Sequence, residues 1–142
     1  MGITLRLKKR DYDKMLAYCE QSLPNEACGL LAGTVEGEIK TVEKVYLLTN
    51  IEASSEHFTM QPKEQFAAVK DARANGIKII GNFHSHPKSP SRPSKEDKRL
   101  AYDSSIEYLI FSLQDRKCPV LKAFGIDQNK LVTIHEIEIL AE

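Results

Sequence analysis

Residues 77–97 read IKIIGNFHSHPKSPSRPSKED, and this stretch determines both the predicted fold and the predicted chemistry. Its apolar first half predicts a strand over residues 77–86, which Pro87 ends. Side chains alternate along a strand, so His84 and His86 are expected to project from the same face. That spacing allows two imidazoles to reach one metal ion.

A carboxylate follows eleven residues after the second histidine. Ser94 is expected to begin a helix of about two turns that extends through Tyr102, with Asp97 on its third residue. The Pro-rich loop of residues 88–93 can fold this carboxylate back over the histidine pair. Two histidines and one carboxylate leave a tetrahedral zinc ion one ligand short, and an open position is typical of catalytic zinc.

Each part of this pattern also has a simpler interpretation. A lone His-x-His on a strand is more often polar surface than a metal site. Ser94 and Asp97 have the spacing of a capping box, in which Ser94 caps the helix and an acidic first turn suits the helix dipole. The two interpretations are compatible, because a capped first turn is a rigid place from which to present a ligand.

Glu26 is the candidate proton carrier. It precedes the apolar run of residues 28–32, a predicted buried strand, and burial there raises the pKa of a carboxyl toward the range useful to a general base and acid. Ser94 can donate its hydroxyl proton to the oxyanion that forms when water attacks a carbonyl. The simpler interpretation of Glu26 is a solvated loop acid. Cys28 paired with a histidine is a conceivable nucleophile, but its apolar C-terminal flank favours an inert thiol.

The remaining pattern predicts an α/β chain. Two amphipathic helices are expected, over residues 11–23 and 63–75. The inner face of the second helix is expected to carry Phe66, Val69 and Ala72. Apolar and β-branched runs predict strands over residues 3–7, 28–32, 39–48, 57–60, 106–113, 120–126 and 131–140. Residues 33–37 supply the turn of a hairpin, and no repeat or linker divides residues 1–142, which are expected to form one domain.

Composition excludes several classes of function. The 142 residues carry 20 Lys and Arg against 20 Asp and Glu, so the formal net charge is zero and nucleic acid and anionic membranes are not expected partners. No stretch approaches the ~18 apolar residues of a membrane span and no signal peptide is indicated, so a cytoplasmic protein is expected. Cys19, Cys28 and Cys118 lack C-x-x-C spacing and are expected to be reduced and mostly buried. His57 and His135 lack companions at ligand spacing and are expected to be structural or surface residues.

Taken together, the candidate residues carry a specific resemblance to a known family. The chain resembles the JAMM motif of the MPN-domain zinc metalloproteases at every motif position, namely Glu26, His84, Ser85, His86, Pro87, Ser94 and Asp97. The segments PNEACGL at residues 24–30 and GNF at residues 81–83 are similar to the compact prokaryotic branch of that family. The similarity extends over nearly the whole chain, from about Leu5 to Ile134.

The resemblance implies a central mixed β-sheet flanked by helices, of the cytidine-deaminase-like kind, with zinc held by His84, His86 and Asp97. It also implies that Glu26 carries the proton and that Ser94 supports the oxyanion. Family members are zinc peptidases or isopeptidases that act at the C-terminal glycine of ubiquitin or ubiquitin-like proteins. Small prokaryotic forms process sulfur-carrier proteins of ubiquitin fold, so the implied partner is a ubiquitin-like or sulfur-carrier protein with a glycine-ended tail.

Two other functions are weighed against this one. A noncatalytic MPN-type interaction module commonly lacks one or more of the metal residues, all of which are present here. A zinc deaminase is suggested by the implied fold, but the H-x-E and P-C-x-x-C signature is absent. A substrate tail can also bind an exposed sheet edge by strand addition, although the sequence indicates no particular edge.

Overall fold

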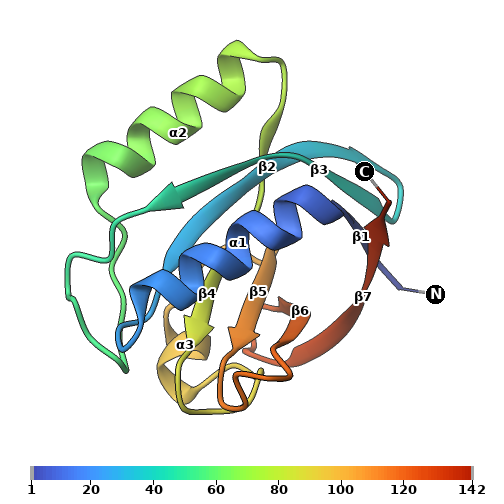
Figure 1. The fold of residues 1–142 in the computed structure, drawn as a ribbon. Coiled ribbons are helices and arrows are strands. Elements are labelled where there is room, and N and C mark those ends of the chain that lie inside the picture. Colours follow the sequence, from blue (N-terminus) through green and yellow to red (C-terminus); the bar gives the residue numbers. More distant parts are fainter. Residues whose placement is uncertain (1, 142) are drawn as a thin grey trace.

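Strands from the two ends of the chain are hydrogen-bonded neighbours. In the computed structural model, which describes residues 2–141, β1 (Thr4–Lys8) pairs in parallel with β7 (Val132–Leu140). This pairing closes a mixed sheet into a barrel with the strand order β1-β3-β2-β4-β5-β6-β7 (Figure 1). The other strands are β2 (Cys28–Glu36), β3 (Ile39–Leu48), β4 (Lys78–His86), β5 (Glu107–Ser112) and β6 (Val120–Ile126). The mixed α/β architecture is confirmed, whereas closure of the sheet was not indicated by the sequence.

Closure leaves little strand edge for an extended tail to pair with. β3 pairs with β1 over residues 39–41 only, and beyond them α1 (Lys9–Ser22) lies beside β3. Lys14 Nζ donates to Val45 O at 3.2 Å, and Tyr18 Oη donates to Leu48 O at 2.5 Å. Side chains of α1 therefore occupy carbonyl groups that strand addition would need.

The two long helices pack on opposite faces of the sheet (Figure 1). Met15 and Cys19 of α1 are fully buried against a core that includes Leu31 of β2. α2 (Pro62–Ala74) packs through Ala68 against a second cluster that includes Leu30. Leu30 and Leu31 are consecutive, so their side chains point to opposite faces and belong to different clusters. Among residues 2–141, none of the helices combines the length and apolar character needed to cross a lipid bilayer.

The predicted inner face of the second helix is wrong in one position. Phe66 is 66% exposed, and Lys70 Nζ lies 5.5 Å from the centre of its ring. The buried residues of α2 are Ala68 and Ala72, which are four apart and small. Small side chains allow the helix to lie close to the sheet, and this contact rotates Phe66 toward solvent.

The predicted hairpin turn is also placed too early. β2 continues through residues 33–36, and the turn lies at Gly37, which has a φ of +60°. Gly33 lies at a bulge where the register shifts, and a Cβ there would meet Thr41 O at 1.8 Å. This glycine permits the close approach of two strands and does not form the turn.

Two short elements differ from expectation as well. Residues 57–60 form no strand, and their one ladder contact is an isolated bridge between Asn50 and Met60. The helix after Ser94 is α3 (Lys95–Arg99), which ends before Tyr102. The segment from residue 50 to residue 60 is therefore an irregular loop beside the candidate site.

Thiol accessibility gives a first prediction. Cys19 and Cys28 are fully buried, and burial raises the pKa of each thiol to about 12, whereas Cys118 is exposed. A thiolate is the reactive form, so native protein at pH 8 is expected to react with one equivalent of a disulfide reagent. Cys118→Ser is expected to remove that reaction, and urea-unfolded wild type should react at all three thiols. Rapid native labelling of Cys118→Ser would contradict the burial of the other two.

Candidate metal centre

β4 presents its two histidines as the alternation of a strand requires. His84 and His86 lie on one face and are 3% and 4% exposed. Ser85 points to the opposite face, where its Oγ accepts a hydrogen bond from Ala27 N at 2.8 Å. Ser85 N also donates to Ala27 O at 3.1 Å, so these two bonds fix the end of β4 to the residue that follows Glu26.

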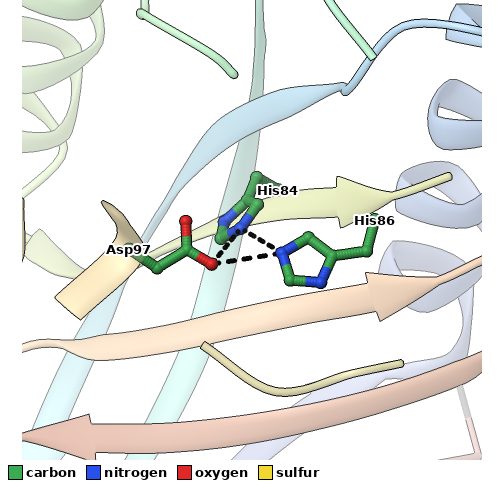
Figure 2. Close-up of side chains that lie close together, drawn as sticks. All are labelled: His84, His86 and Asp97. Carbon is green, nitrogen blue, oxygen red and sulfur yellow. Dashed lines mark hydrogen bonds and ion pairs between the residues drawn. The ribbon is translucent and has the colours of Figure 1, made fainter. Parts of the chain in front are cut away.

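The first turn of α3 supplies the carboxylate. Ser94 Oγ accepts from Asp97 N at 3.0 Å, and Asp97 Oδ2 accepts from Ser94 N at 2.9 Å, which completes a capping box. The same Oδ2 lies 3.2 Å from His84 Nε2 and 3.1 Å from His86 Nε2 (Figure 2). The capping interpretation is correct, and it is compatible with a metal site because the cap holds the carboxylate against the histidines.

The spacing of the three candidate ligand atoms fits zinc. His84 Nε2 and His86 Nε2 are 3.1 Å apart, so with Asp97 Oδ2 they form a nearly equilateral triangle. Ligands at about 2.0–2.1 Å from a tetrahedral zinc lie about 3.3 Å from one another. Within residues 2–141, no other group of at least three His, Cys, Asp or Glu side chains converges in this way.

Hydrogen bonding shows that the cluster needs a positive charge at its centre. His86 Nδ1 lies 2.9 Å from Pro90 O, and because a carbonyl only accepts, Nδ1 must donate. Neutral His86 then directs the lone pair of Nε2 toward Asp97, as a metal ligand does. Although burial opposes ionisation of Asp97, imidazoles that carry a proton at Nε2 would donate to its carboxylate and hold its pKa well below the ordinary value. Electron-rich atoms this close together require a proton or a cation between them.

The loop that carries Pro90 is fixed to β5 at two points. Ser91 Oγ donates to Ile110 O at 2.7 Å, and Ser112 Oγ donates to Ser89 O at 2.6 Å. Both bonds hold the Pro-rich loop against the outer face of the strand next to β4. The Pro90 carbonyl that orients His86 is therefore held in place by the bonds of its loop to β5.

His84 is oriented in a different way. Its ring stacks on Phe58, with ring centres 4.6 Å apart and an angle of 25° between the planes. Its Nδ1 is buried and has no hydrogen-bond partner among the described residues. Burial lowers the pKa of His84, which favours the neutral imidazole that binds metals. His84 is therefore oriented by an aromatic ring packed on its face, whereas His86 is oriented by a hydrogen-bond acceptor behind Nδ1.

Glu26 is buried, so the interpretation as a solvated loop acid is wrong. The residue is 6% exposed, and burial raises its pKa to about 8; a protonated His86 lowers this pKa, and the charge of Asp97 raises it. Its backbone is held on both sides by the 50–60 loop, because Glu26 N donates to Ser54 O at 2.8 Å and Glu26 O accepts from Asn50 Nδ2 at 3.0 Å. The structure therefore places a carboxyl of raised pKa within electrostatic range of the cluster.

A cavity of about 350 Å³ opens beside the cluster. His84 and Asp97 form part of its wall, and most of the remaining wall is apolar or aromatic: Phe58, Met60, Leu100, Tyr108, Ile110 and Ile126. Cavities that bind organic ligands have this composition, with many apolar groups and a few polar ones. The candidate ligands are thus accessible from one apolar side.

One buried ionic network was not found from the sequence. Lys40 Nζ lies 2.8 Å from Glu107 Oε2, and Glu107 Oε1 lies 2.5 Å from His135 Nδ1. Lys40 is 7% exposed and Glu107 is 1% exposed. The three residues come from β3, β5 and β7, and each stands alone in its own segment, so no local spacing connects them. His57, in contrast, is exposed as expected and bonds Glu96 at 2.9 Å.

Comparison with known proteins assigns the chain to a family. Residues 8–124 match the family model described as prokaryotic homologs of the JAB domain. The chain belongs to this family. A protein of Desulfitobacterium hafniense solved in solution is 51% identical to this prokaryotic JAB protein, with a TM-score of 0.89 over 97% of this chain and 94% of the other. The resemblance to JAMM proteins is thereby confirmed.

Two curated relatives of the JAB chain are peptidases or proteases by name. The CysO-cysteine peptidase of Mycobacterium tuberculosis is 31% identical over 79% of this chain and 75% of its own length. The probable TtuB-protein conjugate cleaving protease of Thermus thermophilus is 30% identical over 78% of this chain and 71% of its own length. The desampylase of Haloferax volcanii is 31% identical over 66% of each protein.

Proposed function

We propose that this JAB protein is a zinc-dependent peptidase or isopeptidase that hydrolyses an amide bond at the glycine-ended C-terminus of a ubiquitin-like or sulfur-carrier protein. The observation that carries the proposal is the triangle of His84 Nε2, His86 Nε2 and Asp97 Oδ2, with sides of 3.1–3.2 Å, next to a buried carboxyl. The names of the CysO-cysteine peptidase and the TtuB-protein conjugate cleaving protease support the substrate class.

His84, His86 and Asp97 are the residues that would hold the zinc. When bound, zinc supplies a Lewis acid and lowers the pKa of a water molecule to about 7. The protein contributes the orientation of the ligands, through the Pro90 carbonyl behind His86 and the capping box behind Asp97. The apolar cavity beside them limits access of bulk water to the reacting bond.

Glu26 is the proposed proton carrier. A carboxyl with a pKa of about 8 is protonated in much of the protein near neutral pH, and a dication nearby would bring this value closer to neutrality. Such a group can take a proton from the attacking water and deliver it to the nitrogen of the leaving amine. Its backbone bonds to Ser54 and Asn50 hold the main chain from which the carboxyl projects.

Ser94 is proposed to support the oxyanion. Its Oγ already accepts a hydrogen bond from Asp97 N, so its own hydroxyl proton remains free to be donated. A donor held in advance near the developing negative charge stabilises a tetrahedral intermediate without reorganisation. The residue is exposed, so a substrate carbonyl can approach it.

The function is tested with a defined conjugate. A ubiquitin-like carrier encoded in the same genome, joined through its C-terminal glycine to a short peptide, is incubated with zinc-loaded protein and followed by mass spectrometry. Release of the carrier with a free C-terminal glycine is the expected result. Absence of both cleavage and bound zinc would instead favour the noncatalytic interaction module.

The ligand assignment gives its own prediction. His84→Ala removes one of three ligands, and zinc content is expected to fall from about one equivalent to less than about 0.1 after dialysis. His57→Ala is the matched control, because this histidine is exposed and its side chain bonds only Glu96 among the described residues. Metal analysis by mass spectrometry measures both variants. Full zinc occupancy in His84→Ala would refute the ligand set.

A further inference from the structure

The cavity at the candidate metal centre continues into a second hollow. That second hollow has a volume of about 530 Å³ and lies between α2 and β4. The two hollows share three wall residues, Met60, Gln65 and Asn82. Together they form one groove that leads from His84 and Asp97 to the start of β4 at Lys78.

Two side-chain amides stand unpaired where the hollows meet. Asn82 is two residues before His84 on the same face of β4, and Gln65 lies on α2. Within residues 2–141, neither amide has a hydrogen-bond partner. Three other polar wall groups near this junction are already engaged: Thr59 bonds Glu52, Glu96 bonds His57, and Tyr108 bonds the backbone of Asp103. Asn82 and Gln65 are thus the groove's free hydrogen-bonding side chains in the section that both hollows share.

We propose that Asn82 and Gln65 bind the main chain of the substrate's extended tail as it leaves the metal centre; this inference rests on the proposed function. A primary amide offers one acceptor and two donor hydrogens, which match the N–H and C=O of a peptide group. β4 is paired with β2 on one side and β5 on the other, so β4 itself has no free edge that can satisfy those groups. Burying them unpaired would cost binding energy.

The position of Glu26 identifies which side of the scissile bond enters the groove. Glu26 lines neither hollow of the groove and instead lines a separate small hollow with Tyr18 and Asn50. The leaving amine must lie within reach of Glu26 to receive its proton. The acyl side, which is the glycine-ended tail of the carrier, therefore occupies the groove.

The groove also sets the length of tail that it can hold. It follows β4 from His84 back to Lys78, which is about 20 Å along an extended strand. A tail of about six residues spans this distance. Asn82 lies two residues, about 7 Å, from His84, so a single glycine ends before it reaches either amide and is expected to be insensitive to changes at Asn82 and Gln65.

Two synthetic peptides test the inference. The long probe has alanines before a terminal Gly-Gly, seven residues in all, joined through an amide to a fluorescent amine; the short probe has a single glycine joined to the same amine. The variants Asn82→Leu and Gln65→Met keep side-chain volume and remove the amides, and Gln114→Met on an exposed loop is the control. Each groove variant is expected to raise KM for the long probe about 5–10-fold, with kcat and zinc content unchanged.

The short probe and the control separate main-chain binding from a general defect. KM for the short probe, and KM for either probe with Gln114→Met, are expected to stay within about twofold of wild type. Equal effects on both probes, or no effect on the long probe, would overturn the inference. Gln65 is exposed on α2, so Gln65→Met remains informative if Asn82→Leu fails to fold.

A binding measurement distinguishes failure of this inference from failure of the proposed function. Fluorescence anisotropy of the long probe with Glu26→Gln protein reports occupancy of the groove without turnover. Loss of affinity on adding Asn82→Leu, combined with a zinc-loaded wild type that cleaves neither probe nor conjugate, would support the groove and contradict the hydrolase. If wild type cleaves the long probe, and Asn82→Leu does not change the affinity of Glu26→Gln protein for that probe, the hydrolase is supported and the groove is contradicted.

Discussion

Glu26→Gln is expected to lower the turnover number for conjugate hydrolysis at least about 100-fold while zinc stays bound. Glutamine has nearly the same shape, and the two backbone bonds that hold residue 26, to Ser54 and Asn50, do not involve the side chain. The variant therefore loses the transferable proton and keeps the fold. Turnover is measured with the carrier conjugate, and zinc content with metal analysis.

A matched acidic control makes this measurement specific. Glu52→Gln changes an exposed carboxylate of the 50–60 loop, which bonds Thr59 and none of the cluster residues. Turnover within about threefold of wild type is expected for that control. If Glu26→Gln were as active as Glu52→Gln, Glu26 would have no part in proton transfer.

The same substitution has a stability signature whose sign follows from the raised pKa. Burial raises the pKa of Glu26 from 4.5 to about 8, so the folded protein binds this proton more tightly than the unfolded chain does. The associated stability is fully present below pH 4.5 and is lost as the pH rises toward 8. Zinc-free Glu26→Gln cannot ionise, so it is expected to unfold at a higher temperature than zinc-free wild type at pH 8, with little difference at pH 4.5.

Thermal unfolding followed by circular dichroism at both pH values checks this sign. A gain in stability on removing a proposed catalytic group is typical of active sites, because groups needed for activity often lower the stability of the folded state. Equal melting temperatures at pH 8 would show that Glu26 ionises freely and is not held in a desolvated place.

Local sequence patterns predict the parts of the metal centre because each part obeys a local rule. The period of two along a strand puts His84 and His86 on one face, and the capping box places Asp97 in the first turn of a helix. Both features require only neighbouring residues. The contact of Asp97 with the two histidines across the Pro-rich loop is long-range, and it was expected from the resemblance to JAMM proteins.

Features that depend on packing between distant elements were not predicted. Closure of the barrel depends on β1 meeting β7, and alternation within either strand says nothing about its partner. The buried stripe of α2 runs through Ala68 and Ala72 because the sheet accepts small residues there, whereas hydrophobicity alone favours Phe66. Phe58, which stacks on His84, lies in an irregular loop that has no periodic pattern.

Lys40→Met is expected to lower the free energy of unfolding by about 3–5 kcal/mol. Lys40 Nζ lies 2.8 Å from Glu107 Oε2, and both side chains are almost completely buried. Removing the cation leaves the Glu107 carboxylate without its ammonium partner, with only His135 bonded to its other oxygen. Breaking one partner of a buried pair costs more than the pair contributes, because the remaining charge stays desolvated.

The network lies far from the metal centre, so the defect should be confined to stability. Glu107 is the first residue of β5 and faces Gly81, whereas His84 and His86 face residues nearer the other end of that parallel strand. Urea unfolding measures the loss, and zinc content of the folded Lys40→Met protein is expected to equal that of wild type. A parallel loss of zinc would contradict this separation.

Two further variants identify desolvation of charge as the cause. Lys9→Met removes the cation of a surface pair with Asp13, in which both side chains are 55% exposed, and it is expected to cost less than about 0.5 kcal/mol. The double variant Lys40→Met with Glu107→Leu removes both buried charges and is expected to recover at least half of the loss. If the double variant were less stable than Lys40→Met alone, the loss would come from packing, and the Lys40–Glu107 attraction would not be its source.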